Sequence, residues 1–189
     1  MEFVQPIRDK VKIKLVKDLL KSKSIRDYAL FTLGINSGLR ISDLLNLKIS
    51  DVLTDKGKLK DRISIREKKT GKLKDFPIGP SAGKALKEYL NSSPISINGY
   101  LFKSRKGDNK PISRIQAYRI LNNACETVGL DVQIGTHTLR KTFGYHAYQE
   151  GKDITLIQKL FNHASPSVTL RYIGITQDDL DNVYMTLNL

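Results

Sequence analysis

The sequence lacks the features of a secreted or membrane-spanning protein. It contains a single cysteine, Cys125, which cannot form a disulfide within the chain. No apolar run approaches the roughly 18–20 residues of a membrane-spanning helix, and residues 1–6 lack the basic and then apolar pattern of a secretory signal. We therefore expect a cytoplasmic protein with no membrane segment. Its 189 residues predict a single domain, because a typical domain has about 150 residues.

Patterns that hold metals or nucleotides are missing as well. The three histidines are not paired at metal-ligand spacing, and the sequence has no carboxylate cluster of that kind. It also has no glycine-rich loop of the type that cradles the phosphates of ATP. The sequence therefore predicts neither a metal nor any other cofactor.

Acidic residues are scarce relative to basic ones. The chain has 32 Lys and Arg against 19 Asp and Glu, a formal net charge of +13. Residues 1–119 carry 27 basic and 12 acidic side chains, whereas residues 120–189 carry 5 and 7. With 40% hydrophobic residues the chain is too apolar for a disordered tail, and it is more basic than an average enzyme. This charge favours double-stranded DNA as partner, although a ribosome-like or simply very soluble basic protein is an alternative reading.

Hydrophobic spacing predicts a mainly α-helical chain with one small antiparallel β-sheet, the α+β class. Residues 62–66 alternate with period two, and so do residues 76–78 beyond a turn-like segment at 68–71. They predict a hairpin with a basic tip, in which Lys58, Lys60 and Lys74 fit a solvated edge. Residues 10–20 fit both a helix and a strand, and we favour the helix. Helical spacing and capping signals are found at 24–36, 41–47, 81–90, 113–128, 138–150, 154–160, 165–172 and 176–189.

Two histidines occur beside other polar groups that could carry chemistry. His137 and Arg140 form the sequence His-Thr-Leu-Arg, a pair on one face of a helix, and His163 precedes the helix that ends at Tyr172. Each motif alone is weak, because a histidine at a helix start or a tyrosine in a core is common. The third histidine, His146, lies in mid-helix and receives no role.

Taken together, these groups suit a phosphate. Arg40 and Arg140 with the histidines would supply donors for its non-bridging oxygens. A tyrosine that faces such a phosphate could attack phosphorus and become covalently attached. The ordinary tyrosine pKa near 10 leaves roughly 0.1% phenolate at pH 7, so we expect the surrounding cations to help the phenol lose its proton.

The order of these motifs resembles a known family. The segments are Arg26–Leu30, Ser37–Leu44 (Ser-Gly-Leu-Arg-Ile-Ser-Asp-Leu), Lys69–Gly71, His137–Arg140, and His163 followed nine residues later by Tyr172. They resemble, over about residues 5–175, the catalytic domain of the tyrosine recombinases, the phage integrase family. The resemblance implies the DNA breaking-rejoining fold of that domain. It also implies a site-specific DNA recombinase or integrase that cleaves and rejoins strands without metal or ATP.

The resemblance implies a role for each matched residue. Arg40 and Arg140 would grip the scissile phosphate, with His137 in the same catalytic set. His163 would donate to the phosphate, and Tyr172 would form a 3′-phosphotyrosyl link.

A general acid is implied on the hairpin turn. Lys69 would protonate the departing 5′ oxygen, a role typically worth about 10²–10⁴ in rate. Lys68 and Lys72 lie close enough in the sequence to be alternatives.

Contacts to DNA outside the catalytic set are expected from further basic residues. Most of them would hold the backbone rather than read bases, and the recognised sequence cannot be derived without knowing which helices enter the major groove. The candidates are Lys72, Arg105, Lys106, Arg114, Arg119 and Lys141.

The resemblance also implies an assembly: a homo-tetramer on DNA, built from a chain that is a monomer when free and that associates with the nucleoid when bound. The terminal segment 176–189 would dock on a neighbouring subunit through Leu180, Val183, Tyr184 and Leu187, or pack equally well on its own domain. Two departures stand out. There is no room before residue 5 for the usual N-terminal DNA-clamping domain, so we expect an excised catalytic domain or a compact member of the family. Asn162 stands where the family commonly has glycine.

Two other functions are compatible with the same motifs. One is a non-catalytic DNA-binding regulator on this scaffold. The other is a relaxing activity like that of type IB topoisomerases, which uses the same chemistry without site selectivity.

Overall fold

The computed structural model describes residues 4–92, 96–132 and 134–187, and within them the chain is mostly helical with one two-stranded antiparallel sheet. This confirms the predicted α+β class. The elements in chain order are α1 Lys10–Lys23, α2 Ile25–Ser37, α3 Ile41–Leu45, α4 Ile49–Val52, β1 Arg62–Arg66, β2 Leu73–Pro77, α5 Pro80–Asn91, α6 Arg114–Thr127, α7 Thr138–Gln149, α8 Ile154–Phe161, α9 Pro166–Ile173 and α10 Gln177–Leu187.

Local signals account for where the helices begin and end. The Ser24 side chain accepts a hydrogen bond from the amide of Asp27 and starts α2, which ends at Gly38 in the left-handed conformation with φ 60°. The ambiguous segment 10–20 lies in α1, started by Asp9. Helix α5 begins at Pro80, one residue before its expected start. The short α4 has no counterpart among the predicted helices, and residues 188–189 of the expected terminal helix lie outside the described residues.

The predicted hairpin is present with a defined register. Arg62 pairs with Pro77 and Arg66 with Leu73, so that the turn between the strands carries residues 67–72. Ile63 and Phe76 face the core, whereas their neighbours along the strands are exposed or half-buried. The alternation therefore fixes which face of the hairpin packs on the body and leaves the basic turn at its outer end.

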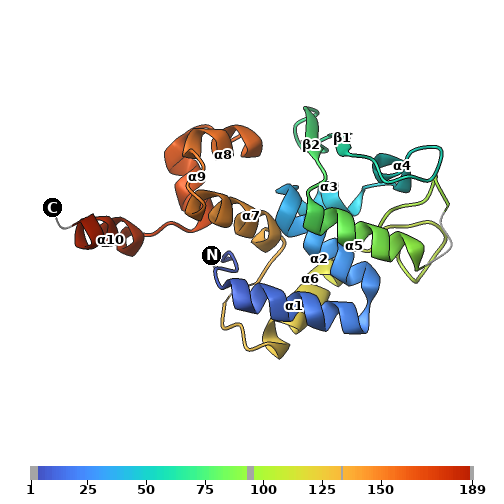
Figure 1. Cartoon of the computed structure of the whole chain (residues 1–189), viewed down its shortest axis with the longest axis horizontal. Helices are drawn as coiled ribbons and strands as arrows, with labels where there is room; N and C mark the ends of the chain where they lie inside the picture. The colour runs from blue at the N-terminus through green and yellow to red at the C-terminus, as the bar shows by residue number, and fades with distance from the viewer. Residues whose placement is uncertain (1–3, 93–95, 133, 188–189) are drawn as a thin grey trace.

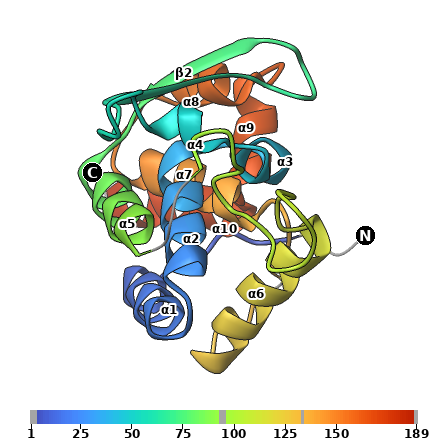
Figure 2. The same cartoon turned by 90° about the vertical axis from the view of Figure 1, so that its right-hand side faces the viewer.

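Helix α2 is the centre of the main core. It packs against α1, α5 and α7, and Figures 1 and 2 show it between these helices. Leu30, Phe31 and Leu33 are at most 1% exposed. A helix buried on this many sides provides a rigid support for the segment that follows it, which contains Arg40.

A second, smaller core joins α8 and α9 to α7. It consists of Ile157, Phe161 and Ile173, with aromatic residues packed around them. The approach is close at Gly144 in α7, where a Cβ would lie 2.6 Å from the Ile173 side chain and 2.7 Å from that of Phe161. Helix α7 therefore contacts the main core on one side and the α8–α9 pair on the other.

The terminal helix α10 extends away from the rest of the molecule (Figure 1). None of its described residues is buried, and the expected apolar stripe is open: Leu180 is 45% exposed and Tyr184 81%. Among the described residues, no helix combines the length and the apolarity that a membrane crossing requires.

Candidate active site

The structure brings the six expected catalytic residues to one region, where the hairpin and the second core meet. Both cartoon views place β2 and α8 on the same side of the molecule (Figures 1 and 2). The residues come from distant segments: Arg40 precedes α3, Lys69 lies in the hairpin turn, His137 and Arg140 are at the start of α7, His163 lies between α8 and α9, and Tyr172 is on α9.

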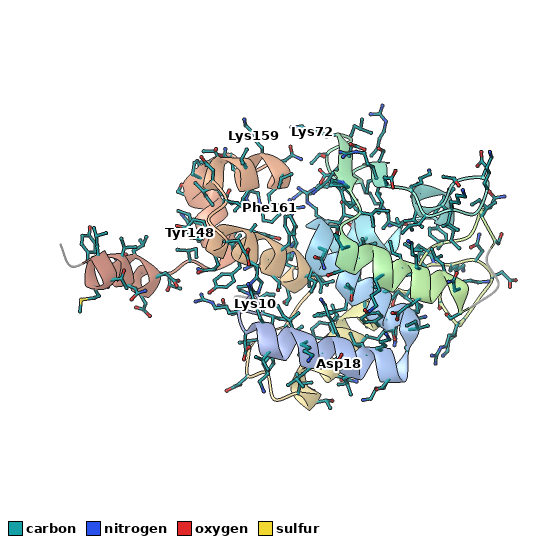
Figure 3. All side chains as sticks on the ribbon, in the orientation of Figure 1. Lys10, Asp18, Lys72, Tyr148, Lys159 and Phe161 are labelled. Atoms are coloured by element: carbon teal, nitrogen blue, oxygen red, sulfur yellow. The ribbon has the colours of Figure 1, made fainter. Side chains whose placement is uncertain are left out.

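Arg140 is buried and held from both cores. It is 2% exposed. One guanidinium nitrogen donates to the carbonyl of Gly38 at 2.6 Å and the other to the carbonyl of Phe161 at 2.8 Å. Its guanidinium carbon lies 4.2 Å from the centre of the Phe161 ring. Phe161, labelled in Figure 3, is the last residue of α8, and its ring packs against that of Phe143 on α7. The guanidinium is therefore fixed at the junction of α2, α7 and α8 before any substrate arrives.

The phenol of Tyr172 faces His137. Nδ1 of the imidazole lies 3.1 Å from the phenol oxygen, a hydrogen-bond distance. The Tyr172 ring is enclosed by the rings of His163, at 4.8 Å between centroids, and of Phe161, at 5.7 Å. The expected nucleophile is thus held within reach of a group that can accept its proton.

Burial dominates the pKa of Tyr172 in this site. It raises the pKa above the usual tyrosine value, while the positive charges of Arg140 and Arg40 act in the opposite direction without reversing it. The expectation that cations help the phenol ionise is therefore right in sign, but the larger effect of burial was not anticipated. The phenol is therefore protonated at neutral pH, and it would need a proton acceptor to act as a nucleophile.

Both site histidines are neutral near pH 7. Burial, followed by the charges of Arg140 and Arg40, lowers the pKa of His163 to about 4. Burial and then the charge of Lys141 also lower the pKa of His137. Nδ1 of His163 lies 3.1 Å from the hydroxyl of Thr169, which fixes the ring orientation. A neutral imidazole can accept a proton at one nitrogen and donate from the other, which suits the roles expected of this pair.

Arg40 is held by a carboxylate that sequence analysis missed. A guanidinium nitrogen of Arg40 lies 2.8 Å from Oε1 of Glu67, whose side chain is fully buried. Glu67 is the residue between β1 and the turn that carries Lys69. No motif points to it, because its only signal is a carboxylate in a basic hairpin.

Asp43 anchors the same turn from α3. Its Oδ1 accepts a hydrogen bond from the backbone amide of Lys68 at 2.9 Å, and the residue is 4% exposed. Lys69, the next residue, has an exposed side chain. The spacing of Arg40 and Asp43, one turn of helix apart, could have indicated that the two side chains share a face.

The expectation that Lys74 belongs to a solvated edge is wrong. Its ammonium group lies 3.2 Å from the carbonyl of Leu160 and 3.5 Å from that of Gly38. Burial, followed by the charge of Arg140, lowers the pKa of Lys74 to about 8. The reason is that β2 packs beside the end of α8, so the side chain points inward. Lys60 likewise donates to the carbonyl of Ser50, while Lys58 is exposed as expected.

The expected DNA contacts occupy different surroundings. Lys141 is buried, donates to the carbonyl of Val4 at 2.7 Å and lies 5.3 Å from the centre of the Tyr172 ring. Lys72 projects from the outer end of the hairpin on the same side of the molecule as Lys159 (Figure 3). The remaining candidates are exposed in the loop before α6 or on α6 itself, namely Arg105, Lys106, Arg114 and Arg119. Their contacts to DNA stay predictions.

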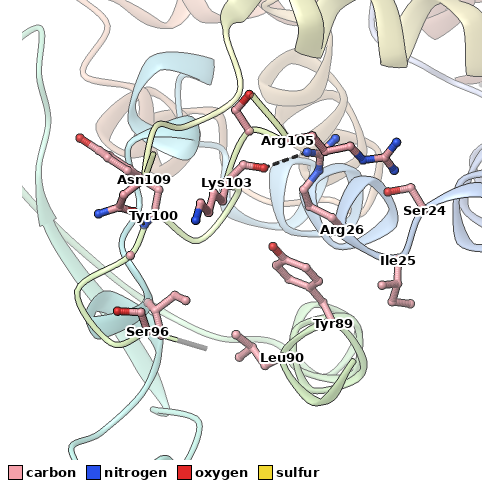
Figure 4. Close-up of a pocket in the computed structure, with 13 residues that line it drawn as sticks. Ser24, Ile25, Arg26, Tyr89, Leu90, Ser96, Tyr100, Lys103, Arg105 and Asn109 are labelled. Carbon is pink, nitrogen blue, oxygen red and sulfur yellow. Dashed lines mark hydrogen bonds between the residues drawn. The ribbon is translucent and has the colours of Figure 1, made fainter. Parts of the chain in front are cut away.

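A cavity of about 610 Å³ lies elsewhere, near the start of α2 and the end of α5 (Figure 4). Two of its polar side chains have partners within the chain: Arg26 donates to the carbonyl of Lys103 at 2.8 Å, and Tyr89 to that of Leu101 at 2.8 Å. None of the six expected catalytic residues lines it. Among the described residues, no group of three or more His, Cys, Asp and Glu side chains is placed to hold a metal ion.

Comparison with known proteins identifies the family. Residues 7–178 match the model of the phage integrase family. The chain is 50% identical over 184 residues to the probable integrase/recombinase YoeC of Bacillus subtilis, and the alignment covers 97% of each protein. It is 34% identical over 177 residues to the tyrosine recombinase XerA of Pyrococcus furiosus, with 93% of this chain and 59% of XerA covered.

Solved structures agree with this assignment. A crystal structure of XerA recombinase superposes with a TM-score of 0.77 at 25% identity, covering 98% of this chain and 65% of the other. A post-cleavage complex of the XerH site-specific recombinase with a palindromic difH substrate shares the fold, with a TM-score of 0.76 at 22% identity and with 99% and 53% covered. The chain thus spans a little over half the length of the Xer relatives and nearly all of YoeC. With its sequence and its fold both matched over almost the whole chain, this protein belongs to the phage integrase family.

Proposed function

We propose that this protein is a site-specific DNA recombinase of the tyrosine type. The observation that carries the proposal is the contact between the Tyr172 phenol and His137, 3.1 Å apart and beside the buried Arg140. A nucleophile, a proton acceptor and a fixed cation are the parts that attack on a phosphodiester needs. The family match and the recombinase relatives support the same conclusion.

In the first step the Tyr172 oxygen attacks the phosphorus of a DNA phosphodiester, and the phenol proton passes to Nδ1 of His137. Arg40 and Arg140 bind the non-bridging oxygens, where negative charge is concentrated, with His163 as a further donor. The bond from phosphorus to the 5′ oxygen breaks. Lys69 gives its proton to that oxygen, leaving a free 5′ hydroxyl and a 3′-phosphotyrosyl link.

The second step reverses the first with a different strand. A 5′ hydroxyl attacks the phosphotyrosyl phosphorus, the bond to the Tyr172 oxygen breaks, and the phenol regains its proton. One phosphodiester replaces another of similar energy, so no ATP is consumed. These residues supply positioning and charge stabilisation, which is most of what phosphoryl transfer asks of a protein.

The excess of basic residues in 1–119 suits a DNA duplex. Lys72 belongs to this segment, and Lys159 of α8 lies on the same side of the molecule (Figure 3). Four copies on two duplexes would allow strand exchange, and the exposed stripe of α10 would join one copy to the next, each copy being a monomer when free. A DNA substrate also favours a cytoplasmic location at the nucleoid. The excess of basic residues predicts that DNA binding weakens markedly as the salt concentration rises.

A covalent-capture experiment tests the proposal. The protein is incubated with a pool of nicked duplexes whose sequence around the nick is randomised, and DNA that stays attached in SDS is recovered and sequenced. We expect wild type and Tyr100→Phe to capture a related set of sequences and Tyr172→Phe to capture none. Absence of any SDS-resistant adduct with wild type, together with specific binding, would instead favour a DNA-binding regulator.

Relaxation of a supercoiled plasmid distinguishes the remaining alternative. A topoisomerase-like protein would relax plasmids whatever their sequence. The recombinase is expected to act efficiently only on plasmids that carry a captured site.

A further inference from the structure

Glu67 is the most buried carboxylate near the site, and the mechanism above gives it no role. The residue is 1% exposed, and its side chain is fully buried. Burial alone would raise its pKa, but the hydrogen bond from Thr70 and the interactions with Arg40 outweigh burial, and the net pKa is lowered. Glu67 is therefore ionised, and an ionised group in such a place is stable only when its partners are well placed.

Glu67 contacts one catalytic candidate directly. It also contacts two residues that are adjacent in sequence to other catalytic candidates. Oε1 lies 2.8 Å from a guanidinium nitrogen of Arg40. Oε2 accepts a hydrogen bond from the Thr70 hydroxyl at 2.7 Å and one from the side-chain amide of Asn162 at 3.3 Å. Thr70 follows Lys69 in the turn, and Asn162 precedes His163. One carboxylate thus contacts one catalytic candidate, Arg40, and the residues adjacent in sequence to two others.

The backbone of Glu67 closes the same turn. Its carbonyl accepts a hydrogen bond from the amide of Gly71 at 2.8 Å, and its amide donates one to the carbonyl of Lys72 at 2.9 Å. The hydroxyl of Thr70 in turn accepts a hydrogen bond from the backbone amide of Lys72 at 3.3 Å. The conformation of the segment that carries Lys69 therefore depends on Glu67 through both its backbone and its side chain.

Asn162 makes the third side-chain contact of Glu67. It adopts the left-handed conformation with φ 53° and ends α8. Glycine adopts that conformation more easily, but glycine has no side chain to reach Glu67. The amide in this place links the end of α8 to the hairpin.

We propose that Glu67 is a positioning residue that sets Arg40 for the phosphate and, through Thr70, sets the Lys69 turn for the leaving oxygen. This inference rests on the proposed function and adds a residue to its site. Arg40 keeps further guanidinium donors for phosphate while one nitrogen is held by Glu67. A misplacement of about 1 Å can cost roughly 10²-fold in rate, so a residue that fixes two groups at once should matter strongly.

The first experiment tests whether Glu67 positions Arg40. It measures single-turnover formation of the SDS-resistant adduct with a captured duplex as substrate. Glu67→Gln keeps the shape and removes the charge that holds Arg40. We expect the adduct to form about 10²-fold more slowly at saturating protein, with the dissociation constant for DNA changed less than about threefold. Asp75→Asn is the matched control, because it removes an exposed carboxylate that pairs with Arg62 on the same hairpin; its rate should equal that of wild type.

The second experiment tests whether Glu67, through Thr70, positions the turn that carries Lys69. It uses a substrate with sulfur in place of the bridging 5′ oxygen. Thiols lose protons near pH 8.5, far more readily than alcohols, so a departing thiolate needs no general acid. Thr70→Val removes the hydroxyl that donates to Glu67. Because Thr70 itself is exposed, the substitution leaves the core intact. We expect this variant to form the adduct about tenfold more slowly than wild type on the oxygen ester and at the wild-type rate on the sulfur ester. The tenfold loss is part of the roughly 10²–10⁴-fold rate enhancement that a general acid provides.

The outcomes separate this inference from the proposed function. A wild-type protein that forms no adduct on either ester overturns the proposed function itself. A wild type that reacts, with Glu67→Gln equally fast or faster, contradicts a positioning role. If Glu67→Gln fails to fold, Thr70→Val decides: an equal slowing on both esters, or none on either, overturns the inference.

Discussion

Nδ1 of His137 lies 3.1 Å from the phenol oxygen of Tyr172, although 35 residues separate them in the sequence. The contact joins the first turn of α7 to α9, two helices whose packing depends on the small core around Phe161. The pKa of His137 is lowered, so its ring is neutral near pH 7. The pKa of the phenol is raised, so its proton remains to be taken. The distance and the two pKa directions are thus those that the proposed proton transfer from Tyr172 to His137 requires.

Replacing the proton acceptor should slow strand cleavage more than it weakens DNA binding. His137→Ala removes the imidazole, and we expect adduct formation to fall by about 10²–10⁴, the usual contribution of a general base. Single-turnover rates and dissociation constants measured on the same duplex check this. His146→Gln is the control, because that histidine contacts the carbonyl of Ile7 away from the phenol. Equal losses in the two variants would contradict the assignment.

The pH dependence of cleavage should reflect a histidine with a lowered pKa. Burial, followed by the charge of Lys141, lowers the pKa of His137 from its ordinary 6.5. The ring then stays neutral as pH falls through 6.5 and becomes protonated only at lower pH. We expect the rate of adduct formation to decline on acidification with a midpoint below pH 6.5. A decline centred at or above pH 6.5 would show that the assigned base is wrong.

The close approach at Gly144 predicts that the second core tolerates no added methyl group. An alanine Cβ there would lie 2.6 Å from Ile173 and 2.7 Å from Phe161. We expect Gly144→Ala to lower the free energy of unfolding by about 1–3 kcal/mol, as overpacking usually does, and to slow adduct formation by displacing α9. Urea denaturation measures the first effect. Gly79→Ala is the control, because no atom lies within 4 Å of a Cβ at that position.

The inward position of Lys74 predicts a distinctive pH dependence of stability. Its pKa is lowered from 10.5 to about 8 by burial and then by the charge of Arg140. Between these values the unfolded chain holds the proton and the folded chain does not, so the free energy of unfolding contributed by this group rises with pH. We expect wild type to gain stability relative to Lys74→Met between pH 8 and pH 10. Urea denaturation measures this. If the denaturation midpoints of the two proteins differ by the same amount at every pH in this range, the prediction is wrong.

The sequence predicted the elements whose signals are local. The capping and spacing signals at 24–36 predicted α2, which Ser24 and Gly38 bound in the structure, and the alternation in residues 62–66 predicted the hairpin. The six expected catalytic residues were found from motif order and lie in one region. The helix and hairpin inferences use only residues near one another in the chain, whereas the six catalytic residues came from a family resemblance in motifs spread from residue 40 to residue 172.

Contacts between distant segments could not be predicted in this way. Glu67 acquires its role from Arg40 and Asn162, 27 residues before it and 95 after it, and nothing in its own neighbourhood indicates that it is buried. Lys74 is turned inward because the carbonyls of Gly38 and Leu160 meet beside β2. Burial also set the pKa of Tyr172, and burial depends on packing rather than on the cations that the motifs suggested.

The most direct measurement is the identity of the residue that carries the DNA. The SDS-resistant adduct is digested with nuclease and protease, and the nucleotide-bearing peptide is fragmented in a mass spectrometer. The chain has eight tyrosines, and this account predicts a 3′-linked nucleotide on Tyr172 alone, with none in Tyr172→Phe. A nucleotide on any other residue, or a 5′ linkage, would contradict it.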